Sequence, residues 1–178
     1  YGQWWDVKEK KQYFLLFLMI LIVYFICAVL LESFIQPAVV ISMIPLSLIG
    51  IFITFYWFEF KFDQGGYAAF LLVSGLVVNS ALYIINDLNN LDKQNKNISR
   101  LNRYIKAYSS KIIPVLLTLV STILGLVPFI FWGNKEPFWF ALAVGTIGGL
   151  VFSIPAIIIF LPIMLKDIVN KKELSDNG

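Results

Sequence analysis

The sequence predicts an all-α membrane protein, built as a bundle of five transmembrane helices. Hydrophobic residues make up 59% of the 178 residues and charged residues only 14%, whereas soluble chains average about 45–50% and about 25%. The apolar residues also gather in five runs, each close to the roughly 20 residues that cross a bilayer as a helix. A soluble fold of this length cannot bury so much apolar surface, which excludes a cytosolic enzyme.

Polar residues and prolines delimit the predicted spans. Charged residues at 8–11 and Glu32 flank the first run, and Pro37, which is tolerated at a helix start, precedes the second. The polar stretch 59–64 separates the second run from the third. The third run ends before Asn86. In chain order, the predicted spans are 13–31, 38–58, 66–85, 112–132 and 138–165.

Charge orients the predicted bundle. Because five is odd, the two ends of the chain lie on opposite sides of the membrane. The connection 86–111 carries six basic and two acidic residues, so the positive-inside rule makes it cytoplasmic. The tail 166–178 is then also cytoplasmic, the segment 1–12 before the first helix lies outside, and all five tryptophans fall at the outer interface. We therefore expect the N-terminus outside and the C-terminus inside, although the lysines of segment 1–12 fit the outside poorly.

The cytoplasmic connection 86–111 divides into two parts. Residues 86–97 are rich in Asn, Asp and Lys, which predicts a flexible linker. Residues 98–108 place apolar side chains at helical spacing with basic ones elsewhere, which predicts an amphipathic helix on the inner membrane surface. A plain connector is favoured over a regulatory lipid-binding role. The apolar positions are Ile98, Leu101, Ile105 and Tyr108.

Residue counts exclude several chemistries. Without any histidine, the chain has no His-based triad and no His-ligated metal. A single cysteine, Cys27, excludes an internal disulfide and a cysteine cluster. We therefore expect no enzyme activity, no cofactor and no metal. The net charge is only +3 and its basic residues are segregated, so we expect contact with the lipid bilayer and not with nucleic acid.

Polar residues inside two spans are the candidate site. No acidic or basic residue lies in the middle of any span, which weighs against a self-contained proton pump. Asn79 and Ser80 lie in the third span and Thr118 in the fourth, and Asn79 and Thr118 are each six residues from the cytoplasmic end. Both then sit roughly 9 Å deep and can share one polar layer. A functional site and a hydrogen bond that only joins two helices, worth about 0.6 kcal/mol, both remain open. Thr118 can also bond its own helix backbone.

Small residues recur along the fifth span. Gly145, Gly149 and Ser153 stand at every fourth position, which indicates a face for close helix packing. The run 138–165 would measure about 42 Å as a straight helix, so we expect it to tilt, kink or protrude. Pro155 and Pro162 within it permit bending.

Five motifs, in order over residues 13–165, carry a family resemblance. Residues 75–82, GLVVNSAL, resemble the family motif G(I/L)VVNNAI, and residues 144–149, VGTIGG, resemble VGTGVMGG. The other three matching stretches are LESF at 31–34, IPL at 44–46 with Gly50 following, and PVLLT at 114–118 with GLVP at 125–128. The chain therefore resembles the C-terminal membrane half of the RND (resistance–nodulation–division) transporters.

The resemblance implies a transporter. RND proteins use the proton gradient to drive efflux across the envelope of Gram-negative bacteria, from the inner membrane. They have about twelve spans in two repeated halves, each with a periplasmic insertion after its first helix. This chain, which opens at Tyr1, would supply the last five spans and would work with the remainder of the same transporter chain. Family members usually form homotrimers with a periplasmic adaptor and an outer-membrane channel.

The resemblance also implies a role for the polar residues. In the family, acidic residues of the first half form a proton relay with polar or charged residues of the second. Asn79 stands where many drug exporters have lysine and many other members have asparagine; Ser80 stands where asparagine is usual, and Thr118 matches the family threonine. All three are candidate relay partners. An asparagine amide can hydrogen-bond a carboxylate in either protonation state without titrating itself.

Two other functions stay open. A non-transporting membrane scaffold or assembly subunit is consistent with the lack of charge inside the spans. A degenerate exporter, which keeps the fold without proton coupling, is consistent with serine at position 80. Intramembrane aspartates in a second hydrophobic half would favour the transporter.

Overall fold

The computed structural model describes residues 2–59, 61–94, 100–132 and 137–165. These residues form helices joined by short connections, and no strand occurs among them. The fifth helix continues through a π-helical turn into a last helical stretch at 161–165. The elements are α1 (Gly2–Leu31), α2 (Gln36–Trp57), α3 (Gln64–Gln94), α4 (Arg100–Trp132), α5 (Pro137–Pro155) and the π turn η2 (Ala156–Phe160).

The helical class and the long apolar helices agree with the prediction. Four helical stretches, lying in α2, α3, α4 and α5, are long and apolar enough to cross a membrane. In α1 the described apolar stretch is shorter and runs over Phe17–Leu31. The whole predicted span 13–31 is nevertheless helical.

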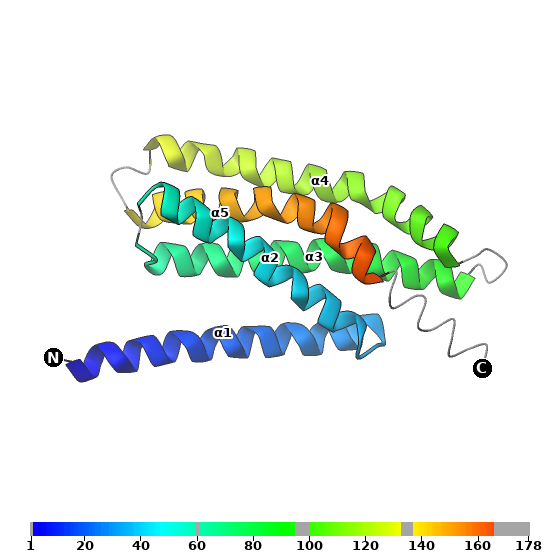
Figure 1. Cartoon of the computed structure of the whole chain (residues 1–178), viewed down its shortest axis with the longest axis horizontal. Helices are drawn as coiled ribbons and strands as arrows, with labels where there is room; N and C mark the ends of the chain where they lie inside the picture. Colours follow the sequence, from blue (N-terminus) through cyan, green and yellow to red (C-terminus); the bar gives the residue numbers. More distant parts are fainter. Residues whose placement is uncertain (1, 60, 95–99, 133–136, 166–178) are drawn as a thin grey trace.

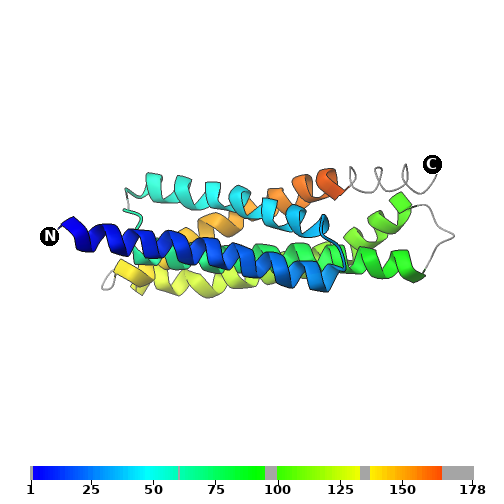
Figure 2. The ribbon, with the colours of Figure 1, turned by 90° about the horizontal axis from the view of Figure 1, so that it is seen from below.

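Successive helices run in opposite directions along the bundle (Figure 1). Helix α2 crosses α3 and α5 at the centre, α4 lies on one side and α1 on the other. Seen from below, α1 follows the outside of the bundle (Figure 2). The C-terminal ends of α1 and α3 and the first residues of α2 and α4 meet at one end, which we call the Lys93 end.

The core lies between α2, α3 and α5. Its largest side chains are fully buried inside the bundle, and Phe55 packs beside Gly145. By contrast, only 11% of the apolar window of α4 is buried. Helix α4 therefore leaves most of its surface for lipid or for another part of the protein. The fully buried core residues include Met43, Ile51, Val73, Val77, Leu150 and Ile157.

The predicted linker at 86–97 is wrong over its first nine residues. Helix α3 continues to Gln94, because Leu88 extends the buried face of Ile84 and Ile85 by one more turn. Residues 95–97 lie outside the described part of the chain. Asn86, Asn89 and Asn90 are thus residues of a helix.

The amphipathic helix predicted at 98–108 is not a separate surface helix. Its described residues, from Arg100 on, form the first turns of α4, which runs without a break to Trp132. Ala107 is buried, and the Tyr108 hydroxyl donates to the Ile158 carbonyl at 3.3 Å. The Tyr108 bond connects the segment to the π turn η2, so the segment is part of the bundle.

Three further points concern the two chain ends and α5. The segment 1–12, predicted to precede the first helix, is helical from Gly2, because Lys, Glu and Gln are good helix formers. The tail predicted at 166–178 lies outside the described residues. The long fifth run contains the π turn η2 between Pro155 and Pro162, and proline, which lacks a backbone N–H, interrupts the regular hydrogen bonding of a helix.

Candidate functional site

Polar contacts between α3 and α4 fix the relative height of these two helices. Ser110 donates a hydrogen bond to Asp87 at 3.0 Å, and the Lys111 ammonium lies 3.5 Å from the same carboxylate. Asn79 precedes Asp87 by eight residues and Thr118 follows Ser110 by eight. Because the helices are antiparallel neighbours, both residues stand about 12 Å from this contact, at one level.

Thr118 lies on the side of α4 that carries the Asp87 contact. It follows Lys111 by seven residues, which is two helical turns, so the two share one face. Thr118 is exposed, and its hydroxyl donates to the Pro114 carbonyl at 2.9 Å. The hydroxyl proton is therefore engaged within α4, while the oxygen keeps lone pairs that can accept a bond.

Ser80 does not share the open face of Asn79. Its side chain is only 6% exposed, and its hydroxyl donates to the Leu76 carbonyl at 2.8 Å. The structure thus satisfies Ser80 within its own helix and turns it toward the bundle. Of the three predicted relay partners, only Asn79 and Thr118 are accessible from outside the five helices.

Asn79 is an exposed amide in the middle of a long apolar helix. It lies within the span Gln64–Leu91, and within the described part of the chain its amide makes no hydrogen bond. An unpaired amide in hydrocarbon costs several kcal/mol. One turn earlier, Gly75 also faces open space, with nothing within 4 Å of an added Cβ. This face of α3 therefore calls for a polar partner that is not among the described residues.

The glycines of α5 lie where α2 and α3 pack closely against α5. A Cβ on Gly145 would lie 2.7 Å from a ring carbon of Phe55, and one on Gly149 would lie 2.8 Å from a methyl of Val73. Ser153 is buried, with its hydroxyl donating to the Leu150 carbonyl at 2.7 Å. All three predicted packing residues thus sit inside the bundle.

Gly148, which lies outside the pattern of every fourth residue, is the tightest of these positions. An added Cβ would collide with the side chain of Thr54 and stand 3.0 Å from the Gly50 carbonyl oxygen. Gly50 faces the same crossing from α2. The pairing of these two glycines, nearly a hundred residues apart in sequence, has no local signal.

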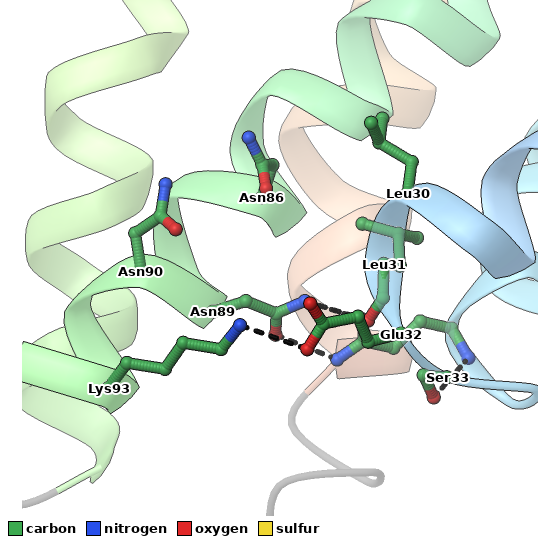
Figure 3. A pocket seen from close by; sticks show the side chains of 9 residues that line it. Leu30, Leu31, Glu32, Ser33, Asn86, Asn89, Asn90 and Lys93 are labelled. Carbon is green, nitrogen blue, oxygen red and sulfur yellow. Dashed lines mark hydrogen bonds and ion pairs between the residues drawn. The ribbon is translucent and has the colours of Figure 1, made fainter.

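A second polar cluster, missed by sequence reasoning, joins three helices at the Lys93 end. Gln36 and Asn89 exchange two amide hydrogen bonds of 2.9 and 2.8 Å, and Asn89 also donates to the Leu31 carbonyl at the end of α1. Lys93 and Glu32 form an ion pair of 2.9 Å. These groups surround a cavity of about 220 Å³ (Figure 3).

Nothing in the described ranges gathers three or more His, Cys, Asp or Glu side chains that could hold a metal ion. The polar groups described between these helices are amides, hydroxyls and two ion pairs, Lys93–Glu32 and Lys111–Asp87. Such groups can bind water or a carboxyl group and can respond to its protonation.

Comparison with known proteins places this geometry in a family context. The profile of the AcrB/AcrD/AcrF family matches residues 6–167. The multidrug resistance protein MdtC of Photorhabdus laumondii is 27% identical over 145 residues, 81% of this chain and 14% of MdtC. MdtC of Pectobacterium carotovorum is 23% identical over 153 residues, 85% of this chain and 15% of the relative.

A relative named for a different role gives a similar match. The swarming motility protein SwrC of Bacillus subtilis is 25% identical over 147 residues, 82% of this chain and 14% of SwrC. The chain thus spans about one seventh of the length of these relatives.

Proposed function

This chain belongs to the AcrB/AcrD/AcrF family, within the RND superfamily that its motifs predict, and we propose that it provides membrane helices of a proton-motive-force-driven efflux transporter. The observation that carries the proposal is Asn79, an exposed amide deep in an apolar helix, without a partner among the described residues. A second set of helices that brings carboxylates to this face would supply the missing partner.

The proposed mechanism uses Asn79 as a partner that does not titrate. An ionised carboxylate accepts a hydrogen bond from the Asn79 amide nitrogen, whereas a protonated carboxyl donates one to the amide oxygen. Thr118 stands at the same height and offers its hydroxyl oxygen as an acceptor. Uptake and release of a proton then switch the hydrogen bonds across this face, and the two sets of helices shift relative to each other.

The proposed orientation puts the Lys93 end in the cytoplasm. Predicted cytoplasmic segments carry nine of the fourteen basic residues. In this orientation the connection between α1 and α2 and the connection between α3 and α4 both lie in the cytoplasm. The membrane that the helices cross is the inner membrane of the cell.

The proposed partners follow from the family. They are the remainder of the same transporter chain, two further copies in a homotrimer, a periplasmic adaptor and an outer-membrane channel. The substrate stays open, because relatives of similar identity are named for multidrug resistance and for swarming motility.

Replacing Asn79 tests the proposal. In the full-length protein, Asn79→Leu removes both the donor and the acceptor while keeping the volume similar. We expect efflux of a fluorescent substrate from intact cells to fall by at least tenfold, the scale on which loss of a positioned hydrogen-bonding group acts. The amount of the protein in the membrane should stay unchanged. Its oligomeric state, measured by gel filtration, should also stay unchanged.

The matched control for Asn79→Leu is Leu117→Ala. Leu117 is exposed on α4, one residue from the level of Asn79, and apolar. This variant should retain efflux. Normal efflux by Asn79→Leu would remove Asn79 from the mechanism.

A non-transporting scaffold is the second candidate, favoured by the absence of charged residues in the middle of the predicted spans. It predicts that Asn79→Leu changes assembly with partner proteins and that no substrate moves in response to a proton gradient. A degenerate exporter predicts normal assembly and no efflux even with Asn79 in place.

A further inference from the structure

The cavity at the Lys93 end lies where the apolar parts of three helices stop. The apolar stretch of α1 ends at Leu31, that of α2 begins at Gln36, and that of α3 ends at Leu91. Leu31 and Gln36 line the cavity, and so do Asn90 and Lys93 on either side of Leu91. Since the headgroups of a bilayer begin where its hydrocarbon ends, the cavity stands at the level of the lipid headgroups.

The wall of this cavity carries one positive and one negative charge, with two amides beside them (Figure 3). The charges are Lys93 and Glu32, whose ion pair is mostly exposed. Such a pair contributes little to stability, so a ligand can separate its members at low cost. The amides are Asn86 and Asn90, which are exposed and make no hydrogen bond with any described part of the chain. Each amide nitrogen can donate two hydrogen bonds to a ligand.

A strip of exposed apolar side chains leads from the cavity along α1. Leu30 lines the cavity and is 53% exposed. Ile26 and Ile22 precede it at steps of four residues and are also exposed. Residues at this spacing lie above one another on one side of a helix. The strip therefore offers an acyl chain about 12 Å of apolar contact, directed from the cavity into the membrane.

We propose that this cavity binds the headgroup of a zwitterionic phospholipid that carries a primary ammonium. The lipid phosphate accepts hydrogen bonds from Lys93 and from the amides of Asn86 and Asn90, and the lipid ammonium donates to the Glu32 carboxylate. One acyl chain lies along the strip from Leu30 to Ile22. A basic pocket between transmembrane helices is a common way to hold a lipid headgroup.

The negative charge of Glu32 sets the preference among lipids. The ammonium of phosphatidylethanolamine can donate hydrogen bonds to this carboxylate, whereas phosphatidylglycerol has no cation to offer it and phosphatidylcholine has no N–H group. The bound lipid then replaces the Lys93–Glu32 ion pair as the link between α1 and α3. Lipid binding does not depend on efflux, so this proposal stands or falls separately from the proposed function.

Photo-crosslinking tests the site in the full-length protein. The vesicles consist of phosphatidylcholine with a small fraction of phosphatidylethanolamine that carries a diazirine near the glycerol end of one acyl chain. A parallel sample contains phosphatidylglycerol with the same chain. After illumination, mass spectrometry identifies the crosslinked residues. We expect crosslinks within 22–36 to be about tenfold more abundant with phosphatidylethanolamine, because a hydrogen bond to a charged group changes affinity on this scale.

Two variants separate the two charges of the headgroup. Glu32→Gln removes the carboxylate that accepts from the ammonium, so the preference for phosphatidylethanolamine should disappear. Lys93→Glu places a second carboxylate beside the phosphate, so crosslinking by both lipids should fall. Lys111→Gln is the matched control, because Lys111 is paired with Asp87 at the same end but does not line the cavity. This control should keep the preference of the wild type.

Three results would overturn the proposal. One is equal crosslinking of 22–36 by the two lipids in the wild type, and another is an unchanged preference in Glu32→Gln. The third is loss of the crosslinks when water-soluble glycerophosphoethanolamine is added at the concentration of the lipid, which would assign the cavity to a soluble ligand. If Lys93→Glu does not assemble, Glu32→Gln decides, because that exposed carboxylate contributes little to stability.

Discussion

At the scale of single residues, glycine decides how closely α2 and α5 approach. At Gly148 the place of a Cβ is already taken by the Thr54 side chain, and the Gly50 backbone lies against it. In a membrane, where burial of apolar surface does not drive helices together, such close packing supplies much of the association energy. Gly125 on α4, by contrast, has nothing within 4 Å of an added Cβ.

The same substitution should therefore have opposite effects at these two glycines. Gly148→Ala forces α2 and α5 apart, and we expect a loss of about 1–3 kcal/mol. Gly125→Ala adds a methyl group in open space and gains up to about 1 kcal/mol of helix propensity. The apparent melting temperature of the detergent-solubilised full-length protein measures both. Equal melting temperatures for the two variants would contradict the tight crossing.

At the scale of elements, α1 is held mainly by its C-terminal end. Cys27 and Leu31 are buried there, whereas most of the other apolar side chains described in α1 are exposed. The Gln36–Asn89 pair ties the end of α1 and the start of α2 to α3, and both side chains are partly buried. The Lys93–Glu32 ion pair beside it is 65% and 72% exposed, so it adds little.

Removing one member of the amide pair should destabilise this joint. Asn89→Leu leaves the Gln36 amide unpaired, and Gln36→Leu leaves the Asn89 amide with only its bond to the Leu31 carbonyl. Either change should cost about 1–2 kcal/mol. The exchange Gln36→Asn with Asn89→Gln keeps both amides and the combined side-chain length, so the double variant should recover most of the melting temperature.

Glu32→Gln is the control for this joint, and we expect a change of at most about 1 kcal/mol. A double variant no more stable than the single variants would show that packing, and not the amide exchange, holds the three helices.

At the scale of the whole molecule, the five helices have one end rich in basic residues and one rich in tryptophan. The structure joins these segments into one bundle whose Lys93 end gathers the ends of α1 and α3 and the starts of α2 and α4. From the charge distribution we propose that this end lies in the cytoplasm.

Reporter fusions in the full-length protein check this orientation. Green fluorescent protein inserted within 95–99 should fluoresce, and alkaline phosphatase inserted there should be inactive. At Lys61, between α2 and α3, we expect active phosphatase. The reverse pattern would invert the bundle and place the Lys93 end on the outer side.

Part of the candidate site was predictable from the sequence because it depends on periodicity. Asn79 stands out as a polar residue in an apolar run, and helix rise alone places Thr118 at its height. The steps from Asn79 to Tyr83, Asn86 and Asn90 also follow helical spacing. The helical position of Asn86 and Asn90 is not apparent from the sequence, because a stretch rich in asparagine is also typical of a linker, although Leu88 continues the apolar period.

The sequence by itself determined the helical class, the approximate positions of the long apolar spans and the residues that are polar inside them, because apolar runs of membrane length and helical periodicity are local properties of the chain. Only the tertiary structure decided which faces are covered. It buried Ser80 and left Asn79 exposed, joined Gln36 to Asn89 across 53 residues, and brought Gly148 against Gly50. These outcomes depend on how whole helices pack and rotate against one another, which no local pattern specifies.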